Sequence, residues 1–340
     1  MSNTNTAAPT VEAPSEARQI NWSLWWDRVG IFLVLILLVL FMAFVAPNFW
    51  SIDNGINVAR SVSINAILAA GMTFVILTGG IDLSVGSILA LSGVASVLMW
   101  TAGWPPLLAV VGGIVVGALS GLANGLLISL LALAAFIVTL GSMTFLRGAA
   151  YTLTDGQPLI ANGLGFRDIG NGGLAGVPIP VVIMVVVYVF SWFILERTKF
   201  GKHVYAVGGN AEAARLAGVK VKSVMTWVYV ISGACAGLAG VIFAARVVSG
   251  QPTAGSGYEL DAIAAVVLGG TGLAGGRGRI LGTLVGAIIL GVLSNGLILM
   301  DVPFFHQLMI KGLVIILAIA IDSLRTRRFG GFRLLKKSMD

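Results

Sequence analysis

The stretch Gly80-Ile-Asp-Leu-Ser84 opens an apolar segment, and the stretch Gly257-Tyr-Glu-Leu-Asp261 opens another in the same way. The match continues at one offset of about 177 residues, so that Leu91-Ser-Gly93 aligns with Leu268-Gly-Gly270. An acidic residue at the same place in two copies predicts a duplicated unit. In a membrane protein, such a duplication is typical of transporters, whose substrate path lies between the repeats.

The composition of the 340 residues predicts a membrane protein. Hydrophobic residues make up 57% of the chain and charged residues 10%, and the mean hydropathy is +0.98. A soluble domain carries roughly a quarter charged residues and could not bury so much apolar surface. The 45 glycines favour close helix packing in a bilayer. The single cysteine, Cys235, excludes an internal disulfide.

About ten apolar windows are long enough to span a bilayer by the usual rule of ~20 residues, and lipid requires each to be helical. The window 259–274 is short and contains Gly269, Gly270 and Gly272, so we expect a broken helix there. The predicted fold is therefore an all-α polytopic membrane protein with repeats at about 29–153 and 178–322. The windows lie near 29–46, 58–79, 83–101, 105–130, 133–153, 178–195, 224–245, 259–274, 280–299 and 304–321.

The positions of Lys and Arg predict the orientation. Basic residues gather in the loop 197–223, at Arg277 and Arg279, and in the tail 323–340, which places these segments and both termini in the cytoplasm. Residues 1–28 lack a basic region before an apolar run, so we expect a disordered cytoplasmic tail rather than a cleaved signal. The net charge of +7 therefore reflects the basic residues on the cytoplasmic side of the membrane and does not indicate nucleic-acid binding.

This orientation makes the two repeats inverted. The segment after Asp82 runs outward, and the segment after Glu259 runs inward. A second repeated motif lies on the next helix of each half, with Asn124-Gly-Leu126 in the first and Asn295-Gly-Leu297 in the second. A glycine ladder at every fourth position also lies on the first of these helices, where it serves either packing inside one subunit or a subunit interface. Its members are Gly113, Gly117, Gly121 and Gly125.

Polar residues at or inside apolar segments are the candidates for a substrate path. The acids either cap helix N-termini, bind a polar solute directly or relay protons. The amides either bind an uncharged, hydroxyl-rich solute or join helices. Arg147 and Lys311, near the ends of spans, are expected to snorkel to an interface. The candidate path residues are Asn65, Asp82, Ser84, Asn124, Gln251, Tyr258, Glu259, Asp261 and Asn295.

The long basic loop contains the signature of a short surface helix. Asn210 can cap its N-terminus, Glu212 lies in its first turn and Gly218 can end it. Such an element between spans is either a docking element for a cytoplasmic partner or a connector. The candidate coupling residues are Gly208, Gly209, Asn210, Glu212, Ala213, Ala214, Arg215 and Gly218.

No catalytic or metal-binding pattern is visible in the sequence. Gly201-Lys202 is followed by His203 and lacks the upstream glycine of a Walker A loop. His203 and His306 lie far apart in sequence, and Cys235 has no companion. We therefore expect no cofactor in this chain, and any ATP and Mg²⁺ on a partner.

Glu212-Ala-Ala-x-x-x-Gly218 resembles the loop by which ABC importer permeases dock on their ATPase. The run Gly71–Ser87 resembles the monosaccharide branch of that family, and the runs Gln251–Asp261 and Leu268–Arg279 resemble its ribose permeases most. The resemblance covers roughly residues 30–322. It implies a homodimer, a tandem-domain ATPase on the cytoplasmic side and a periplasmic sugar-binding protein, which delivers the sugar near Gln251–Asp261 and the loop 154–177.

Two alternatives stay open at this point. An ion-gradient-driven secondary transporter is also compatible with inverted repeats, and the sugar could be another pentose, a hexose, a nucleoside or a furanosyl signal molecule. One departure from the family concerns residues 129–135, which carry no basic residue before Phe136–Gly141. Permeases of this family commonly have a basic residue there. Its absence weakens the expectation that this loop lies in the cytoplasm and contacts an ATPase.

Overall fold

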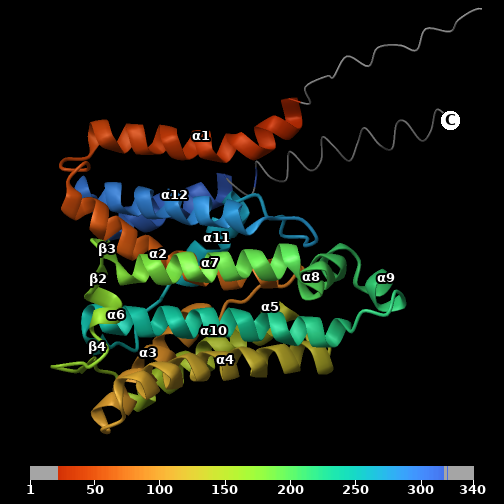
Figure 1. Ribbon diagram of the computed structural model, residues 1–340, viewed down its shortest axis with the longest axis horizontal. Coiled ribbons are helices and arrows are strands. Elements are labelled where there is room, and N and C mark those ends of the chain that lie inside the picture. Colours follow the sequence, from red (N-terminus) through yellow and green to blue (C-terminus); the bar gives the residue numbers. More distant parts are fainter. Residues whose placement is uncertain (1–21, 318–319, 321–340) are drawn as a thin grey trace, which may run out of the picture.

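The computed structural model describes residues 22–317 and 320, and this part of the chain is mostly helical (Figure 1). Each of the ten apolar windows contains one helix. In addition to a last helical segment at 304–317, the main helices are α1 (Trp22–Val45), α2 (Ile52–Leu77), α3 (Val85–Thr101), α4 (Pro106–Leu130), α5 (Ala135–Leu153), α7 (Ile179–Arg197), α10 (Val221–Val247), α11 (Tyr258–Leu268) and α12 (Ile280–Leu299).

The helix lengths confirm a polytopic helical membrane protein, but not the full count of ten spans. Six helices in the described part are long and apolar enough to cross a bilayer, namely α2, α4, α5, α7, α10 and α12. α3 has 17 residues and α11 only 11. The broken helix expected at 259–274 is confirmed, because α11 ends at Leu268 and the following glycines, Gly270, Gly275 and Gly276, have positive φ.

The remaining elements are short and lie at the two ends of the helical body (Figure 1). At one end, the α9 end, are α8 (Lys199–Gly209) and α9 (Ala211–Leu216). At the other end, the strand end, β1 (Leu159–Ile160) pairs antiparallel with β4 (Ser249–Gly250), and β2 (Gly173–Leu174) pairs with β3 (Val177–Pro178). The four-residue α6 (Asp168–Asn171) lies beside these strands.

The predicted boundaries of the termini need one correction. α1 begins at Trp22, so residues 22–28 belong to a helix and not to the disordered tail expected over 1–28. Residues 1–21 and the expected basic tail 323–340 lie outside the described residues.

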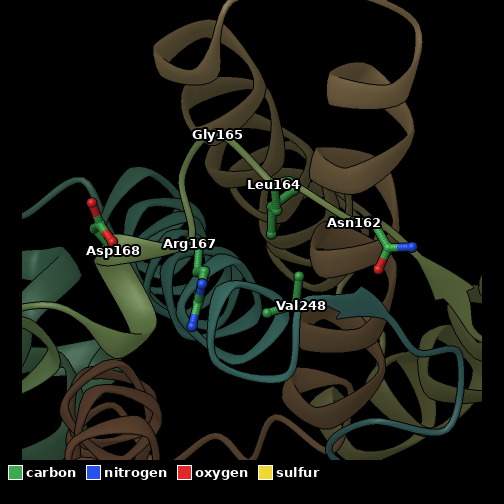
Figure 2. A pocket seen from close by; sticks show the side chains of 7 residues that line it. Asn162, Leu164, Gly165, Arg167, Asp168 and Val248 are labelled. Carbon is green, nitrogen blue, oxygen red and sulfur yellow. The ribbon is translucent and has the colours of Figure 1, made fainter.

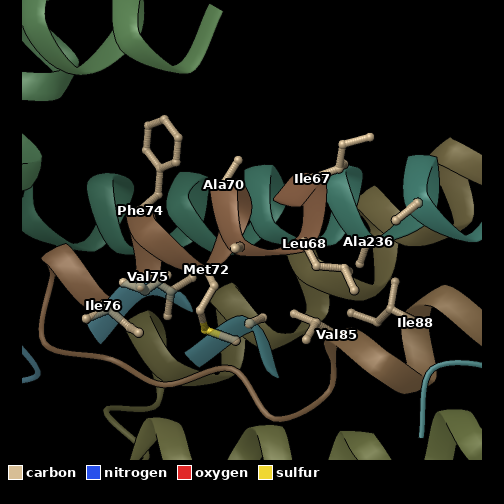
Figure 3. Close-up of a cluster of buried hydrophobic side chains, with 14 of the residues drawn as sticks. Ile67, Leu68, Ala70, Met72, Phe74, Val75, Ile76, Val85, Ile88 and Ala236 are labelled. Atoms are coloured by element: carbon tan, nitrogen blue, oxygen red, sulfur yellow. The ribbon is translucent and has the colours of Figure 1, made fainter. Parts of the chain in front are cut away.

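The core of the molecule is built around α2. All residues from Ala66 to Leu77 are buried, so the helix is apolar on every side, as a fully enclosed helix must be. Figure 3 shows Ile67, Ala70 and Phe74 pointing to one side of this helix and Leu68 and Met72 to the other. α2 packs against α7, α10, α11 and α12.

The glycine ladder of α4 packs against α10 of the same chain. A Cβ at Gly117 would lie 2.7 Å from the Cα of Gly237, and a Cβ at Gly121 would overlap the carbonyl oxygen of Tyr229. Gly233 of α10 faces Gly117 and Gly121 in return. The ladder therefore serves helix packing inside one subunit, because only glycine lets these two backbones approach so closely.

The packing partners of the helices repeat in the two halves. α3 packs against α4 and α10, whereas α11 packs against α12 and α2. The pair α4 and α10 has its counterpart in α12 and α2, and α2 and α10 touch each other at the centre. α2 ends near α8 whereas α10 begins after α9, so these two helices run in opposite directions (Figure 1). This arrangement is the one that inverted repeats produce.

Candidate functional site

A buried carboxylate occupies the non-helical segment between α2 and α3. Asp82 is fully buried, and its Oδ1 accepts hydrogen bonds from the backbone N of Ser84 at 3.0 Å and from Ser84 Oγ at 2.6 Å. Its Oδ2 accepts a hydrogen bond from Ser232 Oγ of α10 at 2.9 Å. Three donors, one of them the backbone N at the start of α3, thus satisfy both oxygens of this carboxyl group in an apolar surrounding.

This hydrogen-bonded group continues across two further helices. Asn124 of α4 donates from Nδ2 to Ser84 Oγ at 2.9 Å, and Ser142 of α5 donates to Asn124 Oδ1. Asn124 and Ser142 also line a hollow of about 470 Å³ between α4 and α5. The sequence predicts Asp82, Ser84 and Asn124 but misses Ser142 and Ser232, because serines in apolar helices usually bond to their own backbone.

The two acids of α11 have separate partners. Glu259 lies in the first turn of α11, and its Oε1 accepts a hydrogen bond from the backbone N of the N-cap residue Gly257 at 3.1 Å. Its other carboxylate oxygen lies against Gly86 in the first turn of α3. Asp261 Oδ2 forms an ion pair with Lys311 Nζ at 3.0 Å, so the expectation that Lys311 snorkels is wrong. A buried carboxylate within reach attracts this ammonium group more strongly than the membrane interface does.

Arg147 of α5 also turns inward, against expectation. Its guanidinium donates to the carbonyl oxygens of Pro252 and Ala254, at 2.7 and 2.5 Å. These carbonyls belong to the loop before α11 and need donors, because they lie outside any helix. The loop touches α3 as well, where Gly255 packs against Gly86. Gln251 and Tyr258, at the two ends of this loop, are half-buried.

Two predicted path residues lie apart from this group. Asn295 of α12 and Asn54 of α2 exchange hydrogen bonds between their side-chain amides, at 2.8 and 3.1 Å. This pair joins two helices, which was the alternative interpretation for the amides. Asn65 lies on α2, and its Oδ1 is buried without a hydrogen-bond partner in the described part of the chain.

The surface helix predicted in the basic loop is α9, and the structure confirms the predicted residues at its two ends. The Asn210 side chain accepts a hydrogen bond from the backbone N of Ala213 at 2.9 Å, and Gly218 has φ +86°. Arg215 pairs with Glu212 through two hydrogen bonds of 2.6 and 3.0 Å, which lowers the pKa of the Glu212 carboxyl. Leu216 is 75% exposed. α9 therefore presents a capped and mostly exposed surface.

The end of α8 is wedged against the helical core. A Cβ at Gly208 would overlap the carbonyl oxygen of Leu77 and lie 2.6 Å from the backbone N of Gly276. These two atoms are themselves hydrogen-bonded at 2.9 Å. Tyr205 donates to the carbonyl oxygen of Gly278 at 3.1 Å, and burial raises the pKa of this hydroxyl, which keeps it protonated. At Gly209, by contrast, a Cβ would meet nothing within 4 Å.

This contact, which we name the inner junction, consists of Gly208, Leu77 and Gly276. It joins the connector α8–α9 to the last residue of α2 and to the loop between α11 and α12. Asp82 follows Leu77 by five residues, so a movement of α9 has a short path to the buried carboxylate. The sequence does not predict this junction, because it brings together three segments far apart in the chain.

Comparisons with known proteins agree with this architecture. Residues 54–319 match the family model described as "Branched-chain amino acid transport system / permease component". The chain belongs to this permease family. It is 47% identical over 315 residues to the ribose import permease protein RbsC of Bacillus subtilis (strain 168), covering 92% of this chain and 98% of that one.

Two further relatives of this permease are also named as sugar permeases. It is 46% identical over 303 residues to the RbsC protein of Escherichia coli (strain K12), covering 88% of this chain and 94% of that one. It is 38% identical over 312 residues to the D-allose transport system permease protein AlsC of the same strain, covering 91% and 96%. No solved structure matches the chain.

Proposed function

We propose that this permease is the membrane-spanning subunit of an ATP-driven ABC importer. We propose further that it carries a monosaccharide, with ribose as its main substrate. The observation that carries the proposal is the identity of 46–47% with ribose import permeases over about nine-tenths of the chain. The relatives that carry allose and arabinose are less similar, at 35–38% identity.

The proposal includes three partners and a location. A second copy of the chain forms a homodimer, a tandem-domain ATPase binds ATP and Mg²⁺, and a periplasmic sugar-binding protein delivers the solute. The permease lies in the inner membrane with both termini and the α9 end in the cytoplasm. The basic residues of the α8–α9 connector and of the loop with Arg277 and Arg279 support this orientation.

The polar residues suit an uncharged solute. Asn124 and Ser142 are the polar residues nearest Asp82 that line the hollow between α4 and α5, together with Ser120, and the rest of its lining is apolar. Neutral amide and hydroxyl groups can both donate and accept hydrogen bonds, as the hydroxyl groups of a sugar require. Few polar groups give weak binding, which suits a permease whose partner selects the sugar.

In the proposed mechanism, the permease receives mechanical work at α9. ATP binding by the partner moves α9, and α8 transmits the movement to the inner junction. Because Gly208 has no free space there, the end of α2 and the loop after α11 must follow. The segment 78–84 then shifts, and with it the hydrogen bonds between Asp82, Ser84 and Asn124.

The proposal is tested by reconstituting the permease with its ATPase and binding protein in liposomes and measuring uptake of labelled ribose. We expect ATP-dependent uptake that excess unlabelled ribose suppresses and that allose and arabinose suppress less. Equal suppression by all three sugars would contradict ribose as the main substrate. Uptake that needs no ATPase would contradict the importer class.

A further inference from the structure

The strand end contains a second junction that mirrors the inner one. Residues 161–171, which we name the outer segment, pack against the last turn of α10. A Cβ at Gly170 would overlap the backbone N of Arg246 and lie 2.7 Å from the carbonyl carbon of Ala245. Gly170 thus meets the end of α10 as Gly208 meets the end of α2, and α10 is the repeat counterpart of α2.

The outer segment also contacts Trp100 of α3 and Pro106 of α4, which flank the turn between these two helices. A Cβ at Gly165 would lie 2.6 Å from the Trp100 ring and 2.8 Å from Pro106. This turn is the counterpart of the loop between α11 and α12, which α8 contacts at the other end. Leu164 and Phe166 are each 3% exposed and anchor the segment in an apolar cluster with α3, α4 and α10. The outer segment is therefore fixed to both elements.

Polar contacts tie the outer segment to the backbone of α10. Asn171 donates from Nδ2 to the carbonyl oxygens of Ala245 at 2.8 Å and of Arg246 at 3.1 Å. These carbonyls lie in the last turn of the helix, where no backbone donor remains for them. On the other side, the backbone N of Ala161 donates to the carbonyl oxygen of Val248 at 3.2 Å.

Val248 carries backbone strain between these two contacts. It ends α10 in the left-handed region, with φ 53° and ψ 38°, which a β-branched residue rarely adopts. Such a conformation persists only when the surrounding structure holds it. Here the holding contacts come from the outer segment and from the pairing of β1 with β4. Any force on the outer segment thus acts on a strained joint at the end of α10.

A pocket of about 500 Å³ opens at this joint. Its lining includes Asn162, Leu164, Arg167, Asp168 and Val248. Figure 2 shows Leu164, Arg167 and Val248 around this hollow. Arg167 and Asp168 are exposed. The pocket is large enough for a side chain of another protein, and the guanidinium of Arg167 favours a carboxylate.

We propose that the outer segment is a second coupling element, through which a docked sugar-binding protein acts on the end of α10. This inference rests on the proposed function. An acidic side chain of the binding protein enters the pocket beside Arg167, and Gly170 and Asn171 pass the movement to Ala245 and Arg246. The binding protein then acts on α10 from the outside, and the ATPase acts on α2 from the inside. These two helices are equivalent in the two repeats.

The test separates docking from transmission in the complete transporter in liposomes. Its two readouts are the affinity for the sugar-loaded binding protein and the stimulation of ATP hydrolysis above the basal rate. Asn171→Asp keeps the side-chain shape but places a carboxylate against two carbonyl oxygens. We expect stimulation to fall by about fivefold or more, the lower range of a coupling between two sites, with the affinity nearly unchanged.

Two further variants complete the design. Arg167→Glu is expected to weaken docking but to give normal stimulation once the binding protein is saturating. Gly173→Ala is the matched control, because a Cβ there meets only the carbonyl oxygen of Val177 at an ordinary 3.5 Å, and it should behave as the wild type. Normal stimulation in Asn171→Asp, or normal docking in Arg167→Glu, would overturn the inference.

A measurement on the unmodified transporter guards against a misfolded variant. Docking of the binding protein should change the hydrogen exchange of the amides at residues 243–248, and unchanged exchange there would overturn the inference. A wild-type transporter that its binding protein does not stimulate at all would instead contradict the proposed function.

Discussion

Asp82 shows how one residue can connect four parts of the fold. Its carboxylate binds Ser84 and Ser232 directly and reaches Asn124 and Ser142 through Ser84. The sequence predicts the importance of Asp82, because an acid inside an apolar segment needs partners. The partners themselves come together only in three dimensions, and no local pattern distinguishes Ser142 or Ser232 from other serines.

Removal of the Asp82 carboxylate should destabilise the permease. In Asp82→Ala, the donors on Ser84 and Ser232 lose their acceptor, and each buried unsatisfied group costs about 1–3 kcal/mol. Thermal unfolding of the detergent-solubilised protein should occur at a clearly lower temperature. The exposed Asp53 on α2 provides the control, since Asp53→Ala should unfold like the wild type. Equal unfolding temperatures for all three proteins would show that the Asp82 group contributes nothing to stability.

Gly208 should transmit movement where Gly209 does not. Gly208→Ala forces the end of α8 away from Leu77 and Gly276, whereas Gly209→Ala places its methyl group in open space. We expect Gly208→Ala to reduce sugar uptake per ATP hydrolysed by about fivefold or more, within the usual range of coupling between sites. The ratio of uptake to hydrolysis in liposomes measures the effect. The same ratio in both variants would exclude the inner junction as the route.

Among the single elements, α9 could be predicted from the sequence, but the contact of its connector with the helical core at the inner junction could not. Asn210 and Gly218 act on neighbouring residues, so the sequence determines where this helix begins and ends. The interpretation of the glycine ladder could be settled only by the structure, which shows α10 of the same chain opposite α4. The inward contacts of Arg147 and Lys311 depend on a loop and a carboxylate more than 40 residues away. Hydropathy carries no information about such partners.

The ion pair of α9 should be visible in a titration. Arg215 lowers the pKa of the Glu212 carboxyl, so the contact is fully present above the ordinary value of 4.5 and is lost as the pH falls through the lowered pKa. Arg215→Gln should therefore raise the pKa of Glu212 toward its ordinary value. Carboxyl NMR of the labelled permease measures this shift. An unchanged titration midpoint would mean that the two side chains do not pair.

Close packing between α4 and α10 should make the ladder intolerant of added atoms. In Gly117→Ala, the new methyl group meets the backbone of α10 at Gly233 and Gly237, and such overpacking costs about 1–3 kcal/mol. Unfolding in detergent should shift accordingly. Gly55→Ala on α2 is the control, because a Cβ there has nothing within 4 Å and alanine favours a helix. A stable Gly117→Ala variant would contradict the packing described for α4.

At the scale of the whole molecule, the two ends are built alike. The inner junction holds the end of α2, and the outer segment holds the end of α10. The duplicated motif at Asp82 and Glu259 predicts this repeat, since both halves keep the same order of helices. The count of spans was harder to predict, because α3 and α11 are shorter than a bilayer crossing. Hydropathy cannot distinguish a half-helix enclosed by protein from a complete span.

We propose that the permease does no work of its own and is driven through α9. The most direct test reconstitutes the purified permease in liposomes and imposes proton or sodium gradients, with and without the ATPase, the binding protein and ATP. We expect labelled ribose to accumulate above the external concentration only when ATP and both partners are present, whatever the gradient. Accumulation by the permease alone under an ion gradient would show that it needs neither the ATPase nor the binding protein.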